Sequence, residues 1–231
     1  CEAMALAKLR GEWAMEKTNA LLIGSYVDAH FEGSLDLFKA QNPEIFLKNG
    51  ELKAEFRKAN EIITKIEEDP IFMLYMSGEK QTIFTGEIGG VAFKVKIDSY
   101  HKDKMLVDGK VMASISKFEW VKDFGKVNFA EYWGYDIQAA IYQEIVRQNT
   151  GMALPFYIAA ASKEKVTDKE SIWVPTDLMN DRLIEVEENM AKLKALKSGE
   201  IEPVRCEKCD YCISTKMIKG PISLYDLQER I

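Results

Sequence analysis

The chain contains only two histidines, His30 and His101, among its 231 residues. A serine hydrolase of the Ser-His-Asp type needs a histidine between a nucleophile and an acid, and nothing in the sequence resembles that arrangement. The glycine-rich loop that holds nucleotide phosphates is also missing, so we expect no ATPase motor within the chain. These absences direct attention to carboxylates, lysines and cysteines.

Long hydrophobic runs are absent as well. No apolar stretch approaches the roughly 18 residues of a membrane span. The first residues lack a basic region followed by a hydrophobic one, so we expect no signal peptide. With 47% hydrophobic and 29% charged residues, the composition is typical of a globular protein with a substantial core. We therefore expect a cytoplasmic protein without membrane contacts, and, since the first residue is Cys1, further residues ahead of it.

Positive charge is in deficit, with 31 Lys and Arg against 37 Asp and Glu, a net charge of −6. This balance counts against nucleic-acid binding, because phosphate contacts come from Lys and Arg. Between Lys94 and Lys126, however, eight lysines accompany five acids. The acidic excess lies elsewhere, notably in residues 163–200, where it indicates a solvated helix face. A basic working surface therefore remains compatible with the composition, and Lys94, Lys96 and Lys117 are the candidate DNA contacts.

Cysteine is scarce, and its four copies sit at the two ends of the chain. Cys206, Cys209 and Cys212 are spaced tightly enough for one metal centre, as in bacterial ferredoxins. A zinc site with four cysteines and free thiols in a reducing cytoplasm are the alternatives. Cys1 stands alone at the other end.

Hydrophobic periodicity and turn residues predict the elements of the fold. Helices are expected at residues 12–40, 51–68, 131–148 and 177–196, and strands at 82–85, 91–97, 104–113, 153–161 and 171–174. Gly89-Gly90 supplies the positive φ of a tight hairpin turn. Helices around a hairpin-rich sheet indicate a single α/β domain over residues 1–231, with the cysteine-bearing tail 203–231 docking near the N-terminus.

Two acids and a lysine fall on neighbouring predicted strands. Asp108 and Lys110 are i and i+2 and project to the same side, and Asp98 ends the preceding strand, where it can face Asp108. Two close carboxylates suit Mg²⁺ or Mn²⁺, which would polarise a phosphoryl oxygen and make hydroxide available near neutral pH. Lys110 would hold the attacking water or offset charge on the phosphate. An exposed strand face also carries Asp and Lys for solubility alone.

The helix that follows carries two further candidates. Gln138 and Tyr142 are i and i+4 and so share one helix face. Gln138 offers an amide that both donates and accepts, and Tyr142 offers a ring with a hydroxyl. The alternative is an amphipathic helix that packs Tyr142 on the sheet.

Four aromatic residues lie near the lysines: Trp120, Phe124, Phe129 and Trp133. They could stack on bases, although such aromatics more often belong to a core or an interface.

The order of these residues, Asp98, then Asp108-x-Lys110, then Gln138-x-x-x-Tyr142, resembles the RecB-like branch of the PD-(D/E)xK nuclease superfamily. The sequence of residues 131–142 is similar to that of phage-encoded RecE-like exonucleases, and the resemblance covers nearly the whole chain. It implies a restriction-endonuclease-like α/β core, with a four- or five-stranded mixed sheet between helices. It also implies two-metal hydrolysis of DNA, with Asp98 and Asp108 as ligands, Lys110 as the catalytic lysine, and Gln138 and Tyr142 in the catalytic set.

The chain departs from that branch at one position. The branch has a metal-binding histidine four residues after a glycine on its first helix, whereas Asp28 follows Gly24 at this distance. Asp28 can ligate Mg²⁺, and Glu32 shares its helix face as a possible second ligand. We therefore expect Asp28, Asp98 and Asp108 to bind metal, with His30 as a packed or surface residue.

The resemblance also bears on the cysteines. Some RecB-like nucleases hold a [4Fe–4S] cluster with one N-terminal and three C-terminal cysteines, which implies Cys1 as the fourth ligand of Cys206, Cys209 and Cys212. The role of such a cluster would be structural, and zinc is the alternative.

The leading interpretation is a metal-dependent exonuclease that digests linear duplex DNA in phage or prophage recombination. It would leave a single strand for an annealing protein, and ring-shaped relatives suggest a homo-oligomer. An endonuclease, a single-strand or flap nuclease, and a non-catalytic DNA-binding module with a degenerate site are the alternatives. Survival of closed circular DNA would separate an exonuclease from an endonuclease.

Overall fold

A computed structural model describes residues 1–122, 124–218 and 220–225. The chain divides into two compact units. The larger unit comprises Lys17–Met190, and the smaller unit combines Cys1–Glu16 with Ala191–Ile231. The description of residues 1–231 as one domain therefore stays a prediction.

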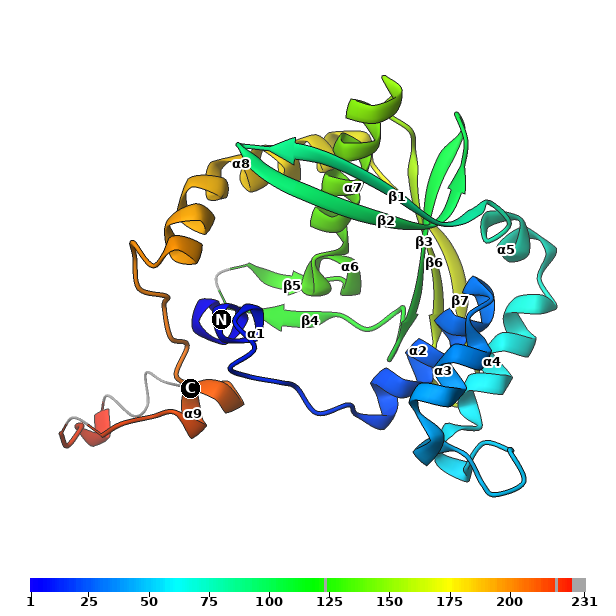
Figure 1. Cartoon of the computed structure of the whole chain (residues 1–231), viewed down its shortest axis with the longest axis horizontal. Helices are drawn as coiled ribbons and strands as arrows, with labels where there is room; N and C mark the ends of the chain where they lie inside the picture. The colour runs from blue at the N-terminus through cyan, green and yellow to red at the C-terminus, as the bar shows by residue number, and fades with distance from the viewer. Residues whose placement is uncertain (123, 219, 226–231) are drawn as a thin grey trace. The chain divides into compact units, whose positions relative to one another are not determined.

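A five-stranded sheet forms the centre of the larger unit (Figure 1). Its strands, in spatial order, are β1 (Glu79–Ile88), β2 (Val91–His101), β3 (Met105–Met112), β6 (Phe156–Ser162) and β7 (Lys169–Val174). The β3–β6 pair is parallel and the other pairs are antiparallel. The turn between β1 and β2 is Gly89-Gly90, with φ values of 55° and 73° that favour glycine. The expected α/β architecture with a mixed sheet is thus confirmed.

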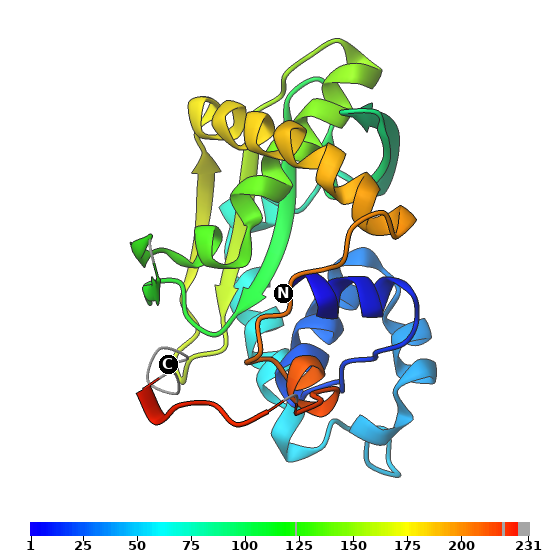
Figure 2. The same cartoon turned by 90° about the vertical axis from the view of Figure 1, so that its left-hand side faces the viewer.

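Helices cover both faces of this sheet (Figures 1 and 2). One face carries α2 (Asn19–Glu32), α3 (Leu35–Gln41), α4 (Lys58–Glu67) and α5 (Pro70–Tyr75), with 3₁₀ turns at Pro43–Ile45 and Ala54–Phe56. The other face carries α6 (Phe129–Trp133), α7 (Tyr135–Thr150) and the first part of α8 (Thr176–Ser198). Each face has its own apolar core, as the alternating burial of β3 requires: Leu106 belongs to one core and Val107 to the other.

Helix α2 is shorter than the helix expected over residues 12–40. It begins after Thr18, whose Oγ1 accepts a hydrogen bond from the Leu21 N–H at 3.2 Å. It ends at Gly33, whose φ of 77° is the left-handed conformation common at helix ends. The sequence therefore contains the signals for both ends of α2, Thr18 and Gly33, and α3 is a separate helix.

The connection from β3 to β6 holds elements that periodicity did not predict. A two-stranded ribbon of β4 (Glu119–Val121) and β5 (Gly125–Val127) precedes α6. The helix expected at residues 131–148 is divided at Gly134, where φ is 69°. Strands of three residues are too short to show alternation, which explains their absence from the expectation.

The smaller unit joins the two ends of the chain. It contains α1 (Glu2–Leu9), the last turns of α8 and α9 (Asp210–Ser214). The Ala3 N–H donates to the Val204 carbonyl oxygen at 3.2 Å, and the Val204 N–H donates to Glu2 Oε2 at 2.9 Å. Within the described ranges, no helix combines the length and apolar character that a membrane crossing requires.

Candidate active site and metal centre

The carboxylate of Asp108 lies buried on β3 and is held from two sides. Nε2 of Gln138, on α7, donates to Oδ1 at 2.8 Å. Nζ of Lys110 forms an ion pair with Oδ2 and lies 4.9 Å from the centre of the Tyr135 ring. Strand and helix together therefore bring Asp108, Lys110 and Gln138 into one cluster, with Asp108 and Lys110 on the same side of the strand.

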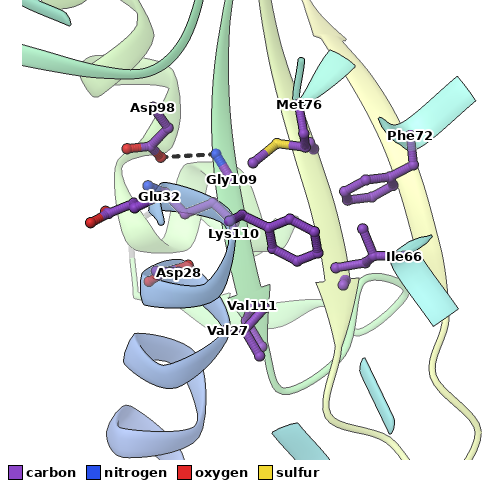
Figure 3. Close-up of a pocket in the computed structure, with 13 residues that line it drawn as sticks. Val27, Asp28, Glu32, Ile66, Phe72, Met76, Asp98, Gly109, Lys110 and Val111 are labelled. Carbon is purple, nitrogen blue, oxygen red and sulfur yellow. Dashed lines mark hydrogen bonds between the residues drawn. The ribbon is translucent and has the colours of Figure 1, made fainter. Parts of the chain in front are cut away.

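Asp98 bridges β2 and β3 where their backbone pairing ends. The ladder runs from His101–Met105 to Ser99–Val107 and stops there. Beyond it, Oδ2 of Asp98 accepts a hydrogen bond from the Gly109 N–H at 3.0 Å (Figure 3). The expectation that Asp98 ends its strand was wrong, because β2 continues to His101. The two strands separate at this point instead, which leaves room for the carboxylate.

Helix α2 adds two more acids to the same side of β3. Asp28 and Glu32 line a recess together with Asp98 and Lys110 (Figure 3). The rest of its lining is mostly apolar, with Phe72 and Met76 among the side chains, and its volume of about 20 Å³ holds one water-sized group. His30 points elsewhere: its Nε2 lies 2.8 Å from an oxygen of Glu67, and the side chain is partly exposed.

The electrostatics of the cluster formed by these acids and Lys110 disfavour its negative charges. Burial raises the pKa of Asp108 to about 6, although Lys110 opposes this. Burial, followed by repulsion from Asp98, raises the pKa of Asp28 to about 7, even though the residue keeps an exposed side. Burial alone would lower the pKa of Lys110, but Asp108 raises it, so the lysine stays charged. A bound cation would relieve this excess of negative charge.

These residues suit a hard divalent cation. Mg²⁺ is held by one or two carboxylates and keeps several waters, so it needs no closed protein cage. Among the described residues, the four cysteines form a group whose ligand atoms converge as for a metal ion, and Asp28, Asp98 and Asp108 do not form such a group. An open set of carboxylates from α2, β2 and β3 therefore fits Mg²⁺ or Mn²⁺ with water in the remaining positions.

Gln81 is a site residue that the sequence did not reveal. It lies on β1 between the pairs Lys80–Ser99 and Thr82–Ile97, which puts it opposite Asp98. Nε2 of Gln81 donates to Asp98 Oδ1 at 3.2 Å. Its φ of 55° is strained for a residue with a side chain. Its Oε1 is buried and has no hydrogen-bond partner among the described residues. Sequence signals of left-handed conformation, such as Gly or Asn, are missing here.

The other predicted residues take less central places. The ring of Tyr142 packs on Phe156, with ring centres 6.1 Å apart, and its hydroxyl shares a side-chain hydrogen bond with Gln138. Lys94 and Lys96 are exposed on β2, and Nζ of Lys96 lies 4.0 Å from Oε1 of Glu32. Lys117 forms an ion pair with Glu119 at 2.6 Å. Whether these lysines contact DNA stays a prediction.

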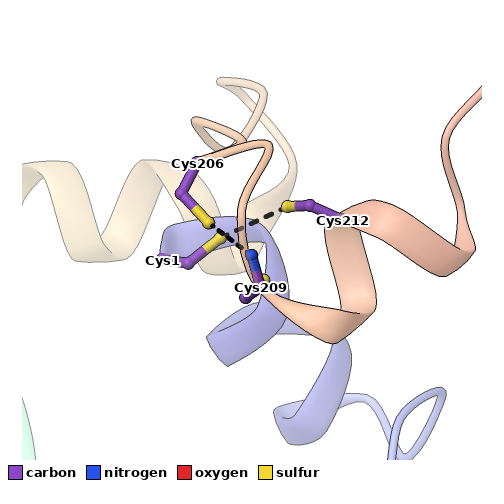
Figure 4. Close-up of side chains that lie close together, drawn as sticks. All are labelled: Cys1, Cys206, Cys209 and Cys212. Atoms are coloured by element: carbon purple, nitrogen blue, oxygen red, sulfur yellow. Dashed lines mark hydrogen bonds between the residues drawn. The ribbon is translucent and has the colours of Figure 1, made fainter. Parts of the chain in front are cut away.

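The four cysteines converge within the smaller unit (Figure 4). The Sγ atoms of Cys1, Cys206, Cys209 and Cys212 lie within 4.8 Å of one another, and those of Cys1 and Cys212 are 3.6 Å apart. Backbone N–H groups of Lys208 and Cys209 lower the pKa of the Cys206 thiol to about 7, which favours the thiolate that binds metals.

Four convergent thiols fit either zinc or an iron–sulfur centre. Four bonds of 2.3 Å in a tetrahedron place the sulfurs about 3.8 Å apart, close to the observed Cys1–Cys212 spacing. A [4Fe–4S] cluster is larger than one ion, so its ligands would have to move apart. The four cysteine sulfurs are therefore a donor set suited to a metal centre, and they lie closer together than the ligands of a [4Fe–4S] cluster would.

Comparison with known proteins places this geometry in a family. Residues 1–215 match the PDDEXK-like domain of unknown function DUF3799. The chain belongs to this PDDEXK-like family. A crystal structure of a candidate exonuclease from Eubacterium rectale is similar to the chain, with a TM-score of 0.93 and 54% sequence identity; the match covers 100% of this chain and 87% of that one. No curated protein matches the sequence.

The family and the neighbour confirm the expected PD-(D/E)xK superfamily and restriction-endonuclease-like fold. They support a nuclease, which is a hydrolase that binds nucleic acid. The roles given to the predicted site residues stay predictions that rest on the contacts above: Asp28, Asp98, Asp108, Lys110, Gln138 and Tyr142.

Proposed function

We propose that this PDDEXK-like protein is a metal-dependent exonuclease that hydrolyses phosphodiester bonds of linear duplex DNA. The observation that carries the proposal is the cluster in which Asp108 contacts both Lys110 and Gln138, beside Asp98 and Asp28. The similarity to a candidate exonuclease from Eubacterium rectale supports digestion from an end.

Each residue of the cluster has a distinct task in this proposal. Asp28, Asp98 and Asp108 would hold Mg²⁺ or Mn²⁺, with Glu32 as a possible further ligand. A divalent ion bound there supplies a polarised phosphate and a water of lowered pKa. Gln138 keeps the Asp108 carboxylate in place through its hydrogen bond at 2.8 Å. Lys110, kept charged by Asp108, offsets the negative charge that builds on the phosphate.

The biological setting follows from the sequence resemblance to phage-encoded RecE-like exonucleases. A single strand left by digestion would pass to an annealing protein during phage or prophage recombination. A homo-oligomer would keep the enzyme on its DNA between successive cleavages.

The four cysteines form the second metal site of the proposal. Similarity to RecB-like nucleases favours a [4Fe–4S] cluster, whereas the compact spacing of the sulfurs favours zinc. In either form, the centre would tie α1 to the C-terminal segment of the smaller unit. Metal analysis of anaerobically purified protein distinguishes iron with sulfide from a single zinc.

The experiment that tests the function compares two DNA substrates of one sequence. Linear duplex and covalently closed circular duplex are incubated with Mg²⁺ or Mn²⁺, and the products are resolved by size. We expect the linear DNA to be consumed from its ends while the circle survives. Cleavage of the circle would replace the exonuclease with an endonuclease, and loss of neither DNA with any metal would leave the non-catalytic binding module.

A further inference from the structure

Exposed aromatic rings gather in one short segment of the larger unit. Among the described residues, the exposed aromatics are Phe118, Trp120, Phe124, Tyr132, Trp133, Trp173 and Tyr225. Five of these seven lie between positions 118 and 133. Trp120 and Phe124 keep 79% and 80% of their surface exposed. We refer to residues 117–133 as the aromatic insertion. Such a concentration of large apolar groups in water marks an interaction surface.

An ordered scaffold presents these rings. In the β4–β5 ribbon Trp120 pairs with Lys126, whose Nζ lies 4.1 Å from the centre of the Phe118 ring. Helix α6 begins with a capping box between Asn128 and Glu131. Phe129, which the sequence offered as a stacking residue, is instead buried in the core and anchors the insertion. The exposed rings therefore project from a ribbon and a capped helix.

In the sequence, the aromatic insertion lies between two elements of the candidate active site. It begins seven residues after Lys110 and ends at Trp133, two residues before Tyr135. The Tyr135 ring lies 4.9 Å from Nζ of Lys110. The insertion thus connects the strand of Asp108 with the helix of Gln138.

The size of the recess indicates which part of a nucleic acid meets them. The recess of about 20 Å³ holds one water-sized group, whereas Asp28 and Glu32 also line a more open hollow of about 230 Å³. If the proposed function holds, a phosphodiester lies at the recess while the adjoining bases remain outside it. Aromatic side chains are the common platform for unpaired bases, because every base has a face that stacks.

The charge of the aromatic insertion favours base stacking over binding of duplex phosphates. Its sequence contains three lysines, Lys117, Lys122 and Lys126, and three acids, so its net charge is zero. A segment with no net positive charge offers few contacts to phosphates, so its exposed rings are the groups through which it would bind a nucleic acid. Rings alternating with exposed lysines suit a single strand, whose bases are accessible and whose backbone needs only local contacts.

We propose that the aromatic insertion binds the unpaired bases of a single DNA strand next to the scissile phosphodiester. This inference rests on the proposed nuclease function and names the form of DNA that the site takes: a frayed or single-stranded end. Trp120 and Phe124, as the most exposed rings, carry most of the stacking.

Binding measured without cleavage tests the proposal. In an Asp108→Asn background, fluorescence anisotropy gives the Kd of a labelled single-stranded oligonucleotide and of a blunt hairpin duplex. We expect Trp120→Ala and Phe124→Ala each to weaken single-strand binding by a factor of roughly 5 to 100, with a smaller effect on the duplex. Trp173→Ala, which removes an exposed ring on β7 (53% exposed), is the matched control and should bind like the parent.

Unchanged single-strand affinity in both variants, or an equal loss in the Trp173→Ala control, would overturn the proposal. A second result would also overturn it: the parent forms an oligomer, and Trp120→Ala dissociates that oligomer without any change in DNA affinity. The rings would then bind a second copy of the chain. Failure of the proposed nuclease function can be distinguished from failure of this inference, because the first appears in the cleavage assay and the second in these DNA affinities.

Discussion

Asp108 is a buried charge whose cost the surrounding contacts only partly offset. Removal of a carboxylate from water is expensive unless it is paired and hydrogen-bonded. Lys110 pairs with one oxygen and Gln138 donates to the other. Its pKa nevertheless stays raised, at about 6. A stable core would be easier to build with an apolar residue here, so the arrangement is typical of a functional site.

Gln81 holds the carboxylate of Asp98 and should therefore affect metal binding. Loss of its amide should weaken binding of Mn²⁺ or Mg²⁺ by roughly 10- to 100-fold, because Nε2 holds one oxygen of Asp98 and partners of ligands usually have effects of this size. Gln81→Ala keeps the backbone strain, whereas Gln81→Gly removes it. Calorimetric titration with Mn²⁺ and thermal melts of both variants measure the two effects separately.

A purely structural role for Gln81 would give the opposite pattern. Metal affinity would then stay at the level of the unmodified protein in both variants, and only the melting temperatures would change. Weaker metal binding in the Gly variant, combined with a melting temperature at or above that of the Ala variant, is the result we expect.

Asp28 makes the stability of the metal-free protein depend on pH. Its pKa rises from 3.8 to about 7 on folding, so the fold favours the protonated form. That stabilisation is complete below 3.8 and is lost as the pH rises through about 7. Because the residue is partly exposed, we expect an effect of about 1 kcal/mol or less. We measure the free energy of unfolding in urea between these pH values, without added divalent metal. It should decline as the pH rises, and it should decline less in Asp28→Asn. An identical decline in the variant would assign it to other groups.

Part of the site was predictable from the sequence. The spacing of Asp108 and Lys110 on a strand fixes their common side, and the fold brings Gln138 to them. Gln81 was not predictable, because its contact with Asp98 depends on a left-handed backbone that its residue type does not signal. The place of Asp98 within β2, rather than at its end, depends on where two strands separate, which is a tertiary property.

At the scale of elements, the connection between β3 and β6 shows where periodicity is informative. Long segments such as α7 and β2 carry enough repeats to be predicted. The β4–β5 ribbon is too short, and the apolar pattern continues through Gly134 as though one helix ran from 131 to 148. Gly134, in its left-handed conformation, ends α6 and lets α7 start in a new direction, toward Asp108.

Substitution of Gly134 tests this break. Its φ is 69°, and an added Cβ would lie 3.9 Å from Ile137 Cδ1, so the cost is conformational and not steric. We expect Gly134→Ala to lower the free energy of unfolding by about 1–2 kcal/mol. Gly134→Asn should lose less, because Asn tolerates this conformation. Chemical denaturation of the two variants measures the difference; an Ala variant as stable as the unmodified protein would show that α6 and α7 can merge.

For the whole molecule, the cysteines decide how the two ends of the chain are held. Cys209→Ser removes one of four converging thiols. We expect a lower melting temperature, by roughly 2–4 °C for each kcal/mol lost. With an iron–sulfur centre, absorbance at about 400 nm should also fall. Ser214→Ala, at the end of the helix α9 that Cys209 precedes, is the control and should leave both unchanged. A melting temperature and bound metal content equal to those of the unmodified protein would remove Cys209 from the centre.

The assignment of the active site is tested most directly by DNA cleavage. The protein and its Asp108→Asn variant are measured side by side over a series of Mg²⁺ and Mn²⁺ concentrations. Asp36→Asn, which changes an exposed acid on α3, is the matched control. We expect metal-dependent loss of linear duplex DNA with the unmodified protein and the control, and no cleavage by Asp108→Asn although it still folds and binds DNA. Cleavage by Asp108→Asn at the rate of the control would contradict the assignment of this cluster as the active site.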